Sequence, residues 1–217
     1  MSIVTSEGGL TALGYALSIL AALVLFVVAG IVSKNSRRAW STRQLVFCGT
    51  AMSLSFITSY IRLFHMPYGG SVTCFSMLFI CLIGFWYGTR VGILTGLAYG
   101  ILQFLQEPYV LSLFQVCCDY VFAFAGLGLA GVFLHSKNGL VKGYILGILV
   151  RGLFHSLGGY LYWMDYMPKE FPKALTAIYP IVYNYSYILA EAILTIVVLM
   201  LPPVKKSLEQ IRRMAIQ

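Results

Sequence analysis

Seven long apolar runs, separated by short polar stretches, form the hydrophobic pattern of this chain. The hydrocarbon core of a bilayer is about 30 Å thick, so a helix needs about 17–25 mainly apolar residues to cross it. The runs are continuous rather than alternating, which argues against the strands of a membrane β-barrel. We therefore predict an all-α integral membrane protein. The predicted spans are Leu10–Val32, Leu45–Phe64, Ser71–Tyr87, Val91–Leu105, Leu113–Leu134, Val141–Met164 and Ile178–Leu201.

The composition supports this class and excludes several others. Of the 217 residues, 59% are hydrophobic and 10% are charged, whereas soluble domains average about 45–50% apolar and about 25% charged residues. So few charges cannot cover a water-facing surface, which excludes a soluble globular protein, a disordered chain and a secreted disulfide scaffold. The five cysteines lie in or beside apolar runs without metal-ligand spacing, so we interpret them as small packing residues.

Basic residues outnumber acidic ones by 15 to 7, which gives a net charge of +8. Most of them lie in loops, so the excess indicates membrane topology rather than a nucleic-acid partner. Alternating spans place eleven Lys and Arg residues on one side and three on the other. The positive-inside rule makes the first side cytoplasmic. We expect the N-terminus outside and the C-terminus inside, with the tail forming an amphipathic helix on the lipid surface.

Glycine recurs every fourth residue from Gly84 through Gly88, Gly92 and Gly96 to Gly100. This spacing places small residues on one helix face and lets a second backbone approach closely. Two interpretations remain open at this point: packing between helices of this chain, and docking on another membrane subunit.

Ionisable residues inside a membrane span are costly and usually mark a functional site. In the sixth span, Arg151, His155, Gly159 and Trp163 follow one another at four-residue steps and therefore share a helix face. Gly159 is expected to leave a gap between the imidazole and the indole in which a flat ring fits. The spacing thus predicts a stripe that faces a ligand.

Two other spans carry polar groups at a similar depth. Gln115 and Asp119 share a face of the fifth span, and Asn184 sits at a similar depth on the seventh, where Tyr187 and Glu191 follow it at i+3 and i+7. At a rise of 1.5 Å per residue, Asp119 lies about 10 Å and His155 about 14 Å below the outer surface. These groups therefore predict a pocket in the outer half of the bilayer, open to the outside.

This pocket combines a carboxylate, an imidazole, an amide and several aromatic rings. Aromatic faces stack on flat heterocycles and attract cations, and a carboxylate among them favours positive charge. We expect a small, flat, cationic or amine-bearing solute. Structural alternatives stay open: Arg151 as a buried partner of Glu191 or Asp119, and His155 in a helix–helix hydrogen bond. Trp163 and the tyrosines are also typical of an interfacial aromatic belt.

Catalytic motifs are absent from the sequence, which contains no HExxH, Walker A or GxSxG motif. Ser156 directly follows His155, so the two side chains project differently from a helix and do not form a nucleophile–base pair. We therefore predict no enzymatic activity and no cofactor. Transport must be passive, use an ion gradient or depend on an energised partner.

Three stretches carry a family resemblance: Met66–Thr73 (MPYGGSVT), Gly96–Gln103 (GLAYGILQ) and Gln115–Tyr120 (QVCCDY). With the runs Arg151–Trp163 and Tyr179–Asn184, they resemble the thiamine-specific S-component of energy-coupling factor (ECF) transporters. The resemblance covers essentially the whole chain apart from the first span and the tail.

The resemblance implies a division of the chain into three parts. These are an N-terminal transmembrane helix with a basic cytoplasmic linker (1–42), a six-helix substrate-binding domain (43–203) and a basic cytoplasmic tail (204–217). The first span is additional to the six-helix core of the family. The small-residue face from Gly49 to Ser59 resembles the docking helix of the family.

Such subunits bind thiamine from outside with high affinity and dock on a transmembrane coupling subunit and two cytoplasmic ATPase subunits, which hydrolyse ATP. The resemblance implies that Asp119 balances the thiazolium charge and that Trp163 stacks on a ring. No tryptophan lies between Arg62 and Gly70, where a lid aromatic is expected, and Phe64 or Tyr68 is the available substitute. The predicted substrate-binding residues are Tyr109, Asp119, Tyr120, Arg151, His155, Gly159, Trp163, Tyr179 and Asn184.

A hypothesis of another class is a stand-alone proton-coupled carrier of thiamine or a thiamine precursor. In this hypothesis Asp119, His155 and Glu191 relay protons. Uptake driven by a pH gradient without any ATPase favours the carrier, whereas strict dependence on ATPase subunits favours the S-component.

Overall fold

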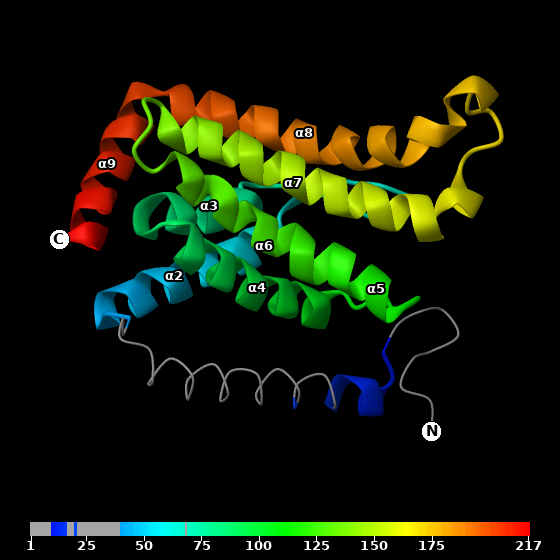
Figure 1. Cartoon of the computed structure of the whole chain (residues 1–217), viewed down its shortest axis with the longest axis horizontal. Helices are drawn as coiled ribbons and strands as arrows, with labels where there is room; N and C mark the ends of the chain where they lie inside the picture. Colours follow the sequence, from blue (N-terminus) through cyan, green and yellow to red (C-terminus); the bar gives the residue numbers. More distant parts are fainter. Residues whose placement is uncertain (1–9, 17–19, 21–39, 68) are drawn as a thin grey trace.

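The structure is a computed structural model that describes residues 10–16, 20, 40–67 and 69–217 (Figure 1). The backbone is helical over 12–16, and most of the predicted first span lies outside the described residues. Long helices run along a common direction, with α7 and α8 side by side. In chain order the elements are α2 (Thr42–Ser59), β1 (Arg62–His65), β2 (Ser71–Thr73), α3 (Ser76–Tyr87), α4 (Thr89–Gln106), α5 (Leu113–Val116), η1 (Cys117–Phe122), α6 (Ala123–Leu127), η2 (Gly128–Phe133), α7 (Gly139–Tyr162), η3 (Met164–Tyr166), η4 (Lys173–Ile178), α8 (Tyr179–Met200) and α9 (Pro202–Ile216).

Three helical segments of the described chain are long and apolar enough to cross a membrane. They are Leu113–Phe133, Gly139–Tyr162 and Lys173–Met200, and α3 is a shorter apolar helix. α2 and α4 have 18 residues each but carry more small and polar side chains. The helical pattern confirms the predicted fold class of an all-α membrane protein, to which the structure adds one small hairpin.

This hairpin corrects the predicted end of the second span. α2 ends at Ser59, where the N–H of Tyr60 donates to the carbonyl of Ile57 and the N–H of Ile61 donates to the carbonyl of Thr58. The next residues form β1, which pairs antiparallel with β2. The prediction that the helix extends to Phe64 was wrong, because apolar composition alone does not distinguish a short strand from the end of a helix.

The predicted third span also begins too early. Its first residues form β2, and Phe75 then adopts a left-handed backbone conformation with φ 65°. α3 therefore starts at Ser76 and has twelve residues. Ile80 and Cys81 have no exposed surface, because α3 is apolar on all sides and the other helices surround it.

The predicted fifth span is a continuous helical segment with changing geometry. α5 is followed by η1, which is a π-helix, then by α6 and by η2, which is a 3₁₀-helix. π-helical turns are rare and occur frequently at functional sites. Asp119 and Tyr120 both lie in η1.

The glycine stripe packs inside the chain. A Cβ on Gly92 would lie 2.5 Å from the Cα of Gly84 and 2.7 Å from the carbonyl oxygen of Gly128. α3, α4 and η2 thus meet with their backbones in contact, which supports the internal-packing interpretation. Gly88 instead adopts φ 92° in the turn between α3 and α4.

The small residues of α2 lie on two different faces. Ala51, Ser55 and Ser59 are buried against the bundle. Gly49 has no neighbouring atom within 4 Å of an added Cβ, and Ser53 is exposed. The row that contains Gly49 and Ser53 therefore faces outward and is available to a partner. Its docking role stays a prediction.

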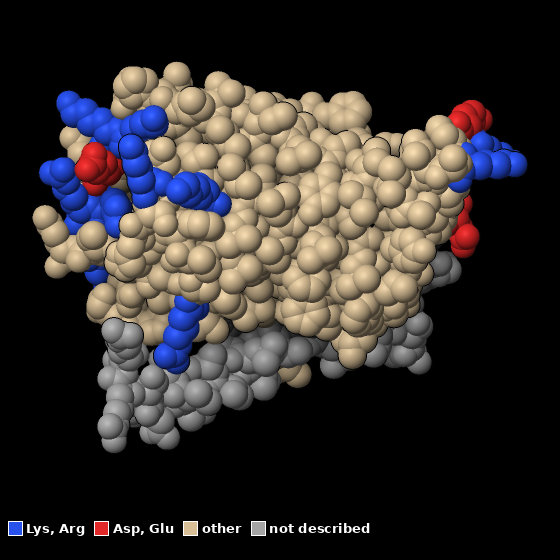
Figure 2. Space-filling model, turned by 45° about the horizontal axis from the view of Figure 1, so that its top comes forward, with Lys and Arg blue, Asp and Glu red and all other residues tan. Residues whose placement is uncertain are grey.

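α9 lies at one end of the bundle, opposite the loop between α7 and α8 (Figure 1). The guanidinium of Arg212 lies 4.9 Å from the centre of the Phe85 ring, and Tyr87 Oη donates to the carbonyl of Ala215 at 2.9 Å. Lys and Arg side chains gather at this end (Figure 2). The helix predicted for the tail is present, with one face packed on the bundle and a basic face exposed.

Candidate functional site

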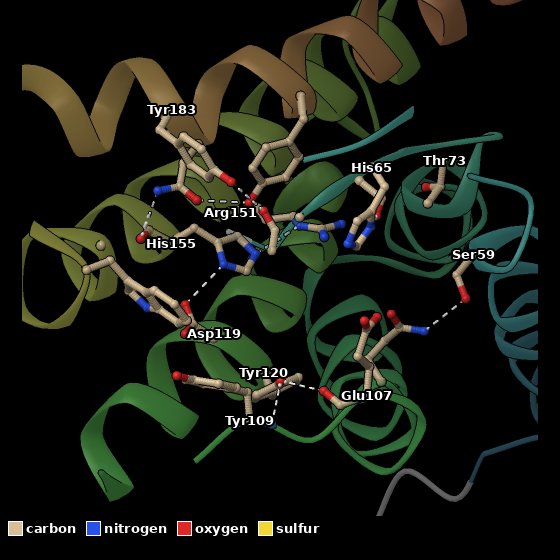
Figure 3. A pocket seen from close by; sticks show the side chains of 18 of the residues that line it. Ser59, His65, Thr73, Glu107, Tyr109, Asp119, Tyr120, Arg151, His155 and Tyr183 are labelled. Atoms are coloured by element: carbon tan, nitrogen blue, oxygen red, sulfur yellow. Dashed lines mark hydrogen bonds and ion pairs between the residues drawn. The ribbon is translucent and has the colours of Figure 1, made fainter. Parts of the chain in front are cut away.

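A cavity of about 520 Å³ opens between the hairpin, α4, η1, α7 and α8 (Figure 3). Small-molecule sites commonly have volumes of about 300–1,000 Å³. The structure brings all nine residues predicted from the sequence to the lining of this one cavity, and their role in binding stays a prediction. They are Tyr109, Asp119, Tyr120, Arg151, His155, Gly159, Trp163, Tyr179 and Asn184.

Asp119 is held by a partner on each carboxylate oxygen. Its Oδ1 lies 3.1 Å from His155 Nδ1, and its Oδ2 accepts a hydrogen bond from Gln115 Nε2 at 2.7 Å. Its side chain is 17% exposed. A Cβ at Gly158 would lie 3.1 Å from Oδ1, so this glycine gives the carboxylate room beside α7. The result is a largely buried carboxylate of fixed orientation.

The hydrogen bonds of His155 assign its tautomer. Arg151 Nε donates to His155 Nε2 at 3.3 Å, so Nε2 carries the lone pair. The proton of the neutral ring is therefore on Nδ1, which donates to Asp119 Oδ1. A chain of three side chains thus joins α7 to η1 (Figure 3).

Arg151 is a cavity-lining cation rather than half of a buried ion pair. Its guanidinium carbon lies 4.5 Å from the centre of the Phe124 ring. In the part of the chain that the structure describes, neither Asp119 nor Glu191 lies within ion-pair distance of it. The geometry therefore does not support the alternative in which Arg151 forms a structural ion pair with Asp119 or Glu191.

Glu191 does not line the cavity, but it is hydrogen-bonded to Thr73 and Ser76, which do. It is 2% exposed, and its Oε2 accepts from the N–H of Thr73 at 3.2 Å and from its Oγ1 at 2.6 Å. Its Oε1 accepts from Ser76 Oγ and Met77 N, both at 3.3 Å. Glu191 thus ties α8 to β2 and to the N-terminal end of α3, where a carboxylate is favoured.

The side-chain amide of Asn184 forms hydrogen bonds through both its nitrogen and its oxygen, and it connects α8 to α7. Its Nδ2 donates to the carbonyls of Pro180 at 2.9 Å and His155 at 3.3 Å, and its Oδ1 accepts from Tyr187 Oη at 2.9 Å. These bonds fix the amide orientation beside the cavity. The second lone pair of Oδ1 remains available to a ligand donor.

Gly159 lines the cavity, but the gap predicted beside it is filled. A Cβ there would lie 3.0 Å from Asn184 Nδ2 and 3.1 Å from Pro180 Cβ. The prediction that a flat ring fits between His155 and Trp163 at this glycine was therefore wrong. Gly159 instead lets α8 approach α7 closely.

Three aromatic rings gather at the mouth of the cavity. Trp163 directly follows the end of α7 and no longer has helical φ and ψ angles. Its ring centroid lies 4.8 Å from that of Tyr109 and 5.2 Å from that of Tyr166. Tyr109 lies in the loop between α4 and α5, where burial raises the pKa of its phenol. This ring therefore stays neutral at physiological pH.

The two other predicted tyrosines shape the cavity walls. Tyr120 Oη donates to the carbonyl of Glu107 at 2.7 Å and accepts from the N–H of Tyr109 at 3.2 Å. Its hydroxyl thus holds the loop between α4 and α5. Tyr179 begins α8, and its ring packs edge-on against Phe171, with the ring centroids 5.0 Å apart.

Sequence reasoning missed the polar wall that α2, α4 and the hairpin contribute. Gln103 Nε2 donates to Ser59 Oγ at 3.2 Å and to Gln106 Oε1 at 2.8 Å. At the mouth, Arg62 Nη2 lies 2.6 Å from Glu107 Oε2. Two glutamines three residues apart at the end of an apolar run were the available signal, since polar side chains are costly there.

The expected lid aromatic is not found in the described part of the hairpin. Phe64 is 58% exposed and does not line the cavity, while Tyr68 lies outside the described residues. The hairpin is instead held to α8, because Tyr183 Oη donates to the carbonyl of Gly69 at 3.0 Å. Gly70 has φ 85°, and a Cβ there would lie 2.6 Å from the Tyr187 ring.

Comparison with known proteins places this arrangement in a family. Residues 45–210 match the model of the thiamine transporter protein family (Thia_YuaJ). The chain belongs to this family. It is 32% identical over 155 residues to the thiamine transporter ThiT of Bacillus subtilis (strain 168), an alignment that covers 63% of this chain and 76% of that protein.

A solved structure of ThiT from Listeria monocytogenes has the same fold. The TM-score is 0.57 with 22% sequence identity, and the match covers 74% of this chain and 94% of that one. These findings confirm the resemblance to thiamine transporters. The chain is accordingly a membrane transport protein and not an enzyme.

Proposed function

We propose that this chain takes up thiamine across the cell membrane as the high-affinity substrate-binding subunit of an ECF-type transporter. Membership of a thiamine transporter family supports thiamine as the substrate. The chemistry of the cavity supports it independently, because thiamine is a cation with two flat rings.

The observation that carries the proposal is the Asp119 carboxylate inside a ring-lined cavity. A carboxylate with restricted access to water attracts a cation more strongly than an exposed one. We assign Asp119 to the thiazolium charge and the face of Trp163 to one of the two rings. Asn184 and His155 supply hydrogen-bonding groups for the heteroaromatic edge.

The proposal includes an orientation in the membrane. Lys and Arg side chains gather at the α9 end (Figure 2), opposite the loop between α7 and α8 (Figure 1), and Trp163 directly follows α7 at the start of this loop. The positive-inside rule makes the α9 end cytoplasmic, so the cavity faces outside, and the seven spans predicted from the sequence then place the N-terminus outside as well.

Energy for uptake would come from partner subunits. The sequence contains no nucleotide-binding loop and predicts no cofactor in this chain. We propose that a transmembrane coupling subunit and two cytoplasmic ATPase subunits supply the ATP hydrolysis. The rival proton-coupled carrier gains no support from the cavity, since Glu191 contacts Thr73, Ser76 and Met77 instead of the Asp119–His155 pair.

Titration of the purified protein with thiamine tests the proposal. We expect a saturable quench of tryptophan fluorescence, because Trp163 lies at the mouth of the cavity. The separate pyrimidine and thiazolium fragments should bind more weakly than the whole vitamin. No fluorescence change and no heat of binding with thiamine or with either fragment would refute the proposal.

A further inference from the structure

Gln115 is a buried side chain at the start of the helical segment that carries Asp119. It is 1% exposed and lines the cavity. Ser112 caps α5, since its Oγ accepts from the N–H of Gln115 at 3.0 Å. Ser-x-x-Gln is a capping box, in which the glutamine normally reaches back to the N–H of the capping residue. Here its Oε1 accepts from the N–H of Leu111, one residue earlier, at 3.1 Å.

The contact with Leu111 settles which way the amide of Gln115 points. A backbone N–H can only donate, so the amide atom that faces Leu111 must be the oxygen. The NH₂ group therefore faces Asp119, and Nε2 donates to Oδ2 at 2.7 Å. A hydrogen bond to an ionised carboxylate is among the stronger kinds in proteins.

The other carboxylate oxygen of Asp119 is held from a different helix. His155 Nδ1 lies 3.1 Å from Oδ1, and Arg151 orients the ring through Nε2. The carboxylate plane is thus fixed from both sides, by Gln115 at the start of α5 and by α7. Loss of the Gln115 bond would leave Oδ2 free to rotate away from its present direction.

We propose that Gln115 is a positioning residue that aims the Asp119 carboxylate at the cationic ring of the substrate. It does so by linking Oδ2 to the backbone of the loop between α4 and α5. The inference rests on the proposed function and extends it to a residue that sequence reasoning left outside the binding set.

The first test compares a cationic with a neutral ligand. Gln115→Leu keeps a similar side-chain volume and removes both hydrogen bonds. We expect the affinity for thiamine to fall about tenfold, while the affinity for 3-deazathiamine, a neutral isostere, changes less than about threefold. Equal losses for both ligands would overturn the positioning role, because a general disturbance of the cavity affects both.

The second test is a double-mutant cycle. In the Asp119→Asn background there is no carboxylate to aim, so adding Gln115→Leu should not lower thiamine affinity further. Additive losses would overturn the inference. Gln115→Met is the alternative variant if the leucine protein does not purify in folded form, and Gln210→Leu on α9 is the matched control.

The two proposals fail in different ways. If the unmodified protein binds no thiamine, the proposed function is refuted. If it binds thiamine but Gln115→Leu and Gln115→Met bind it equally well, only the role of Gln115 is refuted.

Discussion

At the scale of single residues, Asp119 is the decisive group. Asp119→Asn keeps the shape and removes the charge that the substrate cation would meet. We expect thiamine affinity to fall at least about tenfold, a loss of about 1.5–3 kcal/mol, in isothermal titration in detergent. The exposed Asp165→Asn is the matched control. Unchanged binding in Asp119→Asn would remove Asp119 from the site.

Trp163 is the second residue with a distinct signature. In Trp163→Ala, the affinity for thiamine should fall about tenfold because a stacking face is lost. The fluorescence quench should disappear as well. Trp86→Phe in the buried core should retain the quench, and a quench that survives in Trp163→Ala would contradict the stacking assignment.

Residue-level prediction from the sequence succeeded where helical spacing was sufficient. Arg151 and His155 do share a face of α7, and both line the cavity. The prediction of a gap beside Gly159 failed, because spacing within one helix does not show which side chains a neighbouring helix contributes. The amide of Asn184, which belongs to α8, occupies the space beside that glycine.

At the scale of elements, the position of η1 depends on a glycine of α4. A Cβ on Gly100 would overlap the carbonyl oxygen of Tyr120 and lie 3.3 Å from Phe124 Cβ. We expect Gly100→Ala to destabilise the protein by about 1–3 kcal/mol, the usual cost of overpacking. Thermal unfolding in detergent measures it.

The control for this prediction is Gly49→Ala in α2. An added Cβ there meets nothing within 4 Å, and alanine favours a helix by up to about 1 kcal/mol over glycine. Its melting temperature should be unchanged or higher. Equal melting temperatures for Gly100→Ala and the unmodified protein would show that α4 and η1 separate without cost.

The hairpin should depend on Glu191. In Glu191→Gln, one of the two acceptor oxygens becomes an NH₂ group, which cannot accept from the N–H of Thr73 if it replaces Oε2 or from the N–H of Met77 if it replaces Oε1. We expect faster hydrogen exchange at one or both of these amides, measured by mass spectrometry or NMR. Glu209→Gln on α9 is the control, and unchanged protection at both amides would contradict the anchoring role of Glu191.

The hairpin itself could not be predicted from hydrophobic pattern. The residues of β1 and β2 continue the apolar runs of α2 and α3, and their pairing depends on contacts between distant segments. Thr73 is held by Glu191, 118 positions along the chain. The long helices α7 and α8 were predicted well, because sustained apolar runs of that length have few alternatives.

At the scale of the whole molecule, the source of energy separates the two transport hypotheses. We expect proteoliposomes containing this chain to accumulate thiamine only when a coupling subunit and ATPase subunits are present with ATP. A pH gradient alone should have no effect. Accumulation driven by that gradient in the absence of ATPase would support the proton-coupled carrier instead.

The stacked rings of Tyr109 and Trp163 have a kinetic consequence. Their centroids are 4.8 Å apart, whereas an inserted ring needs about 3.5–4 Å of contact distance on each face. A ring that bound between them would therefore enter only after the pair has parted. At high thiamine concentration, the rate of binding would then be limited by how often the two rings separate. Dissociation would require the same separation, so it would be slow as well.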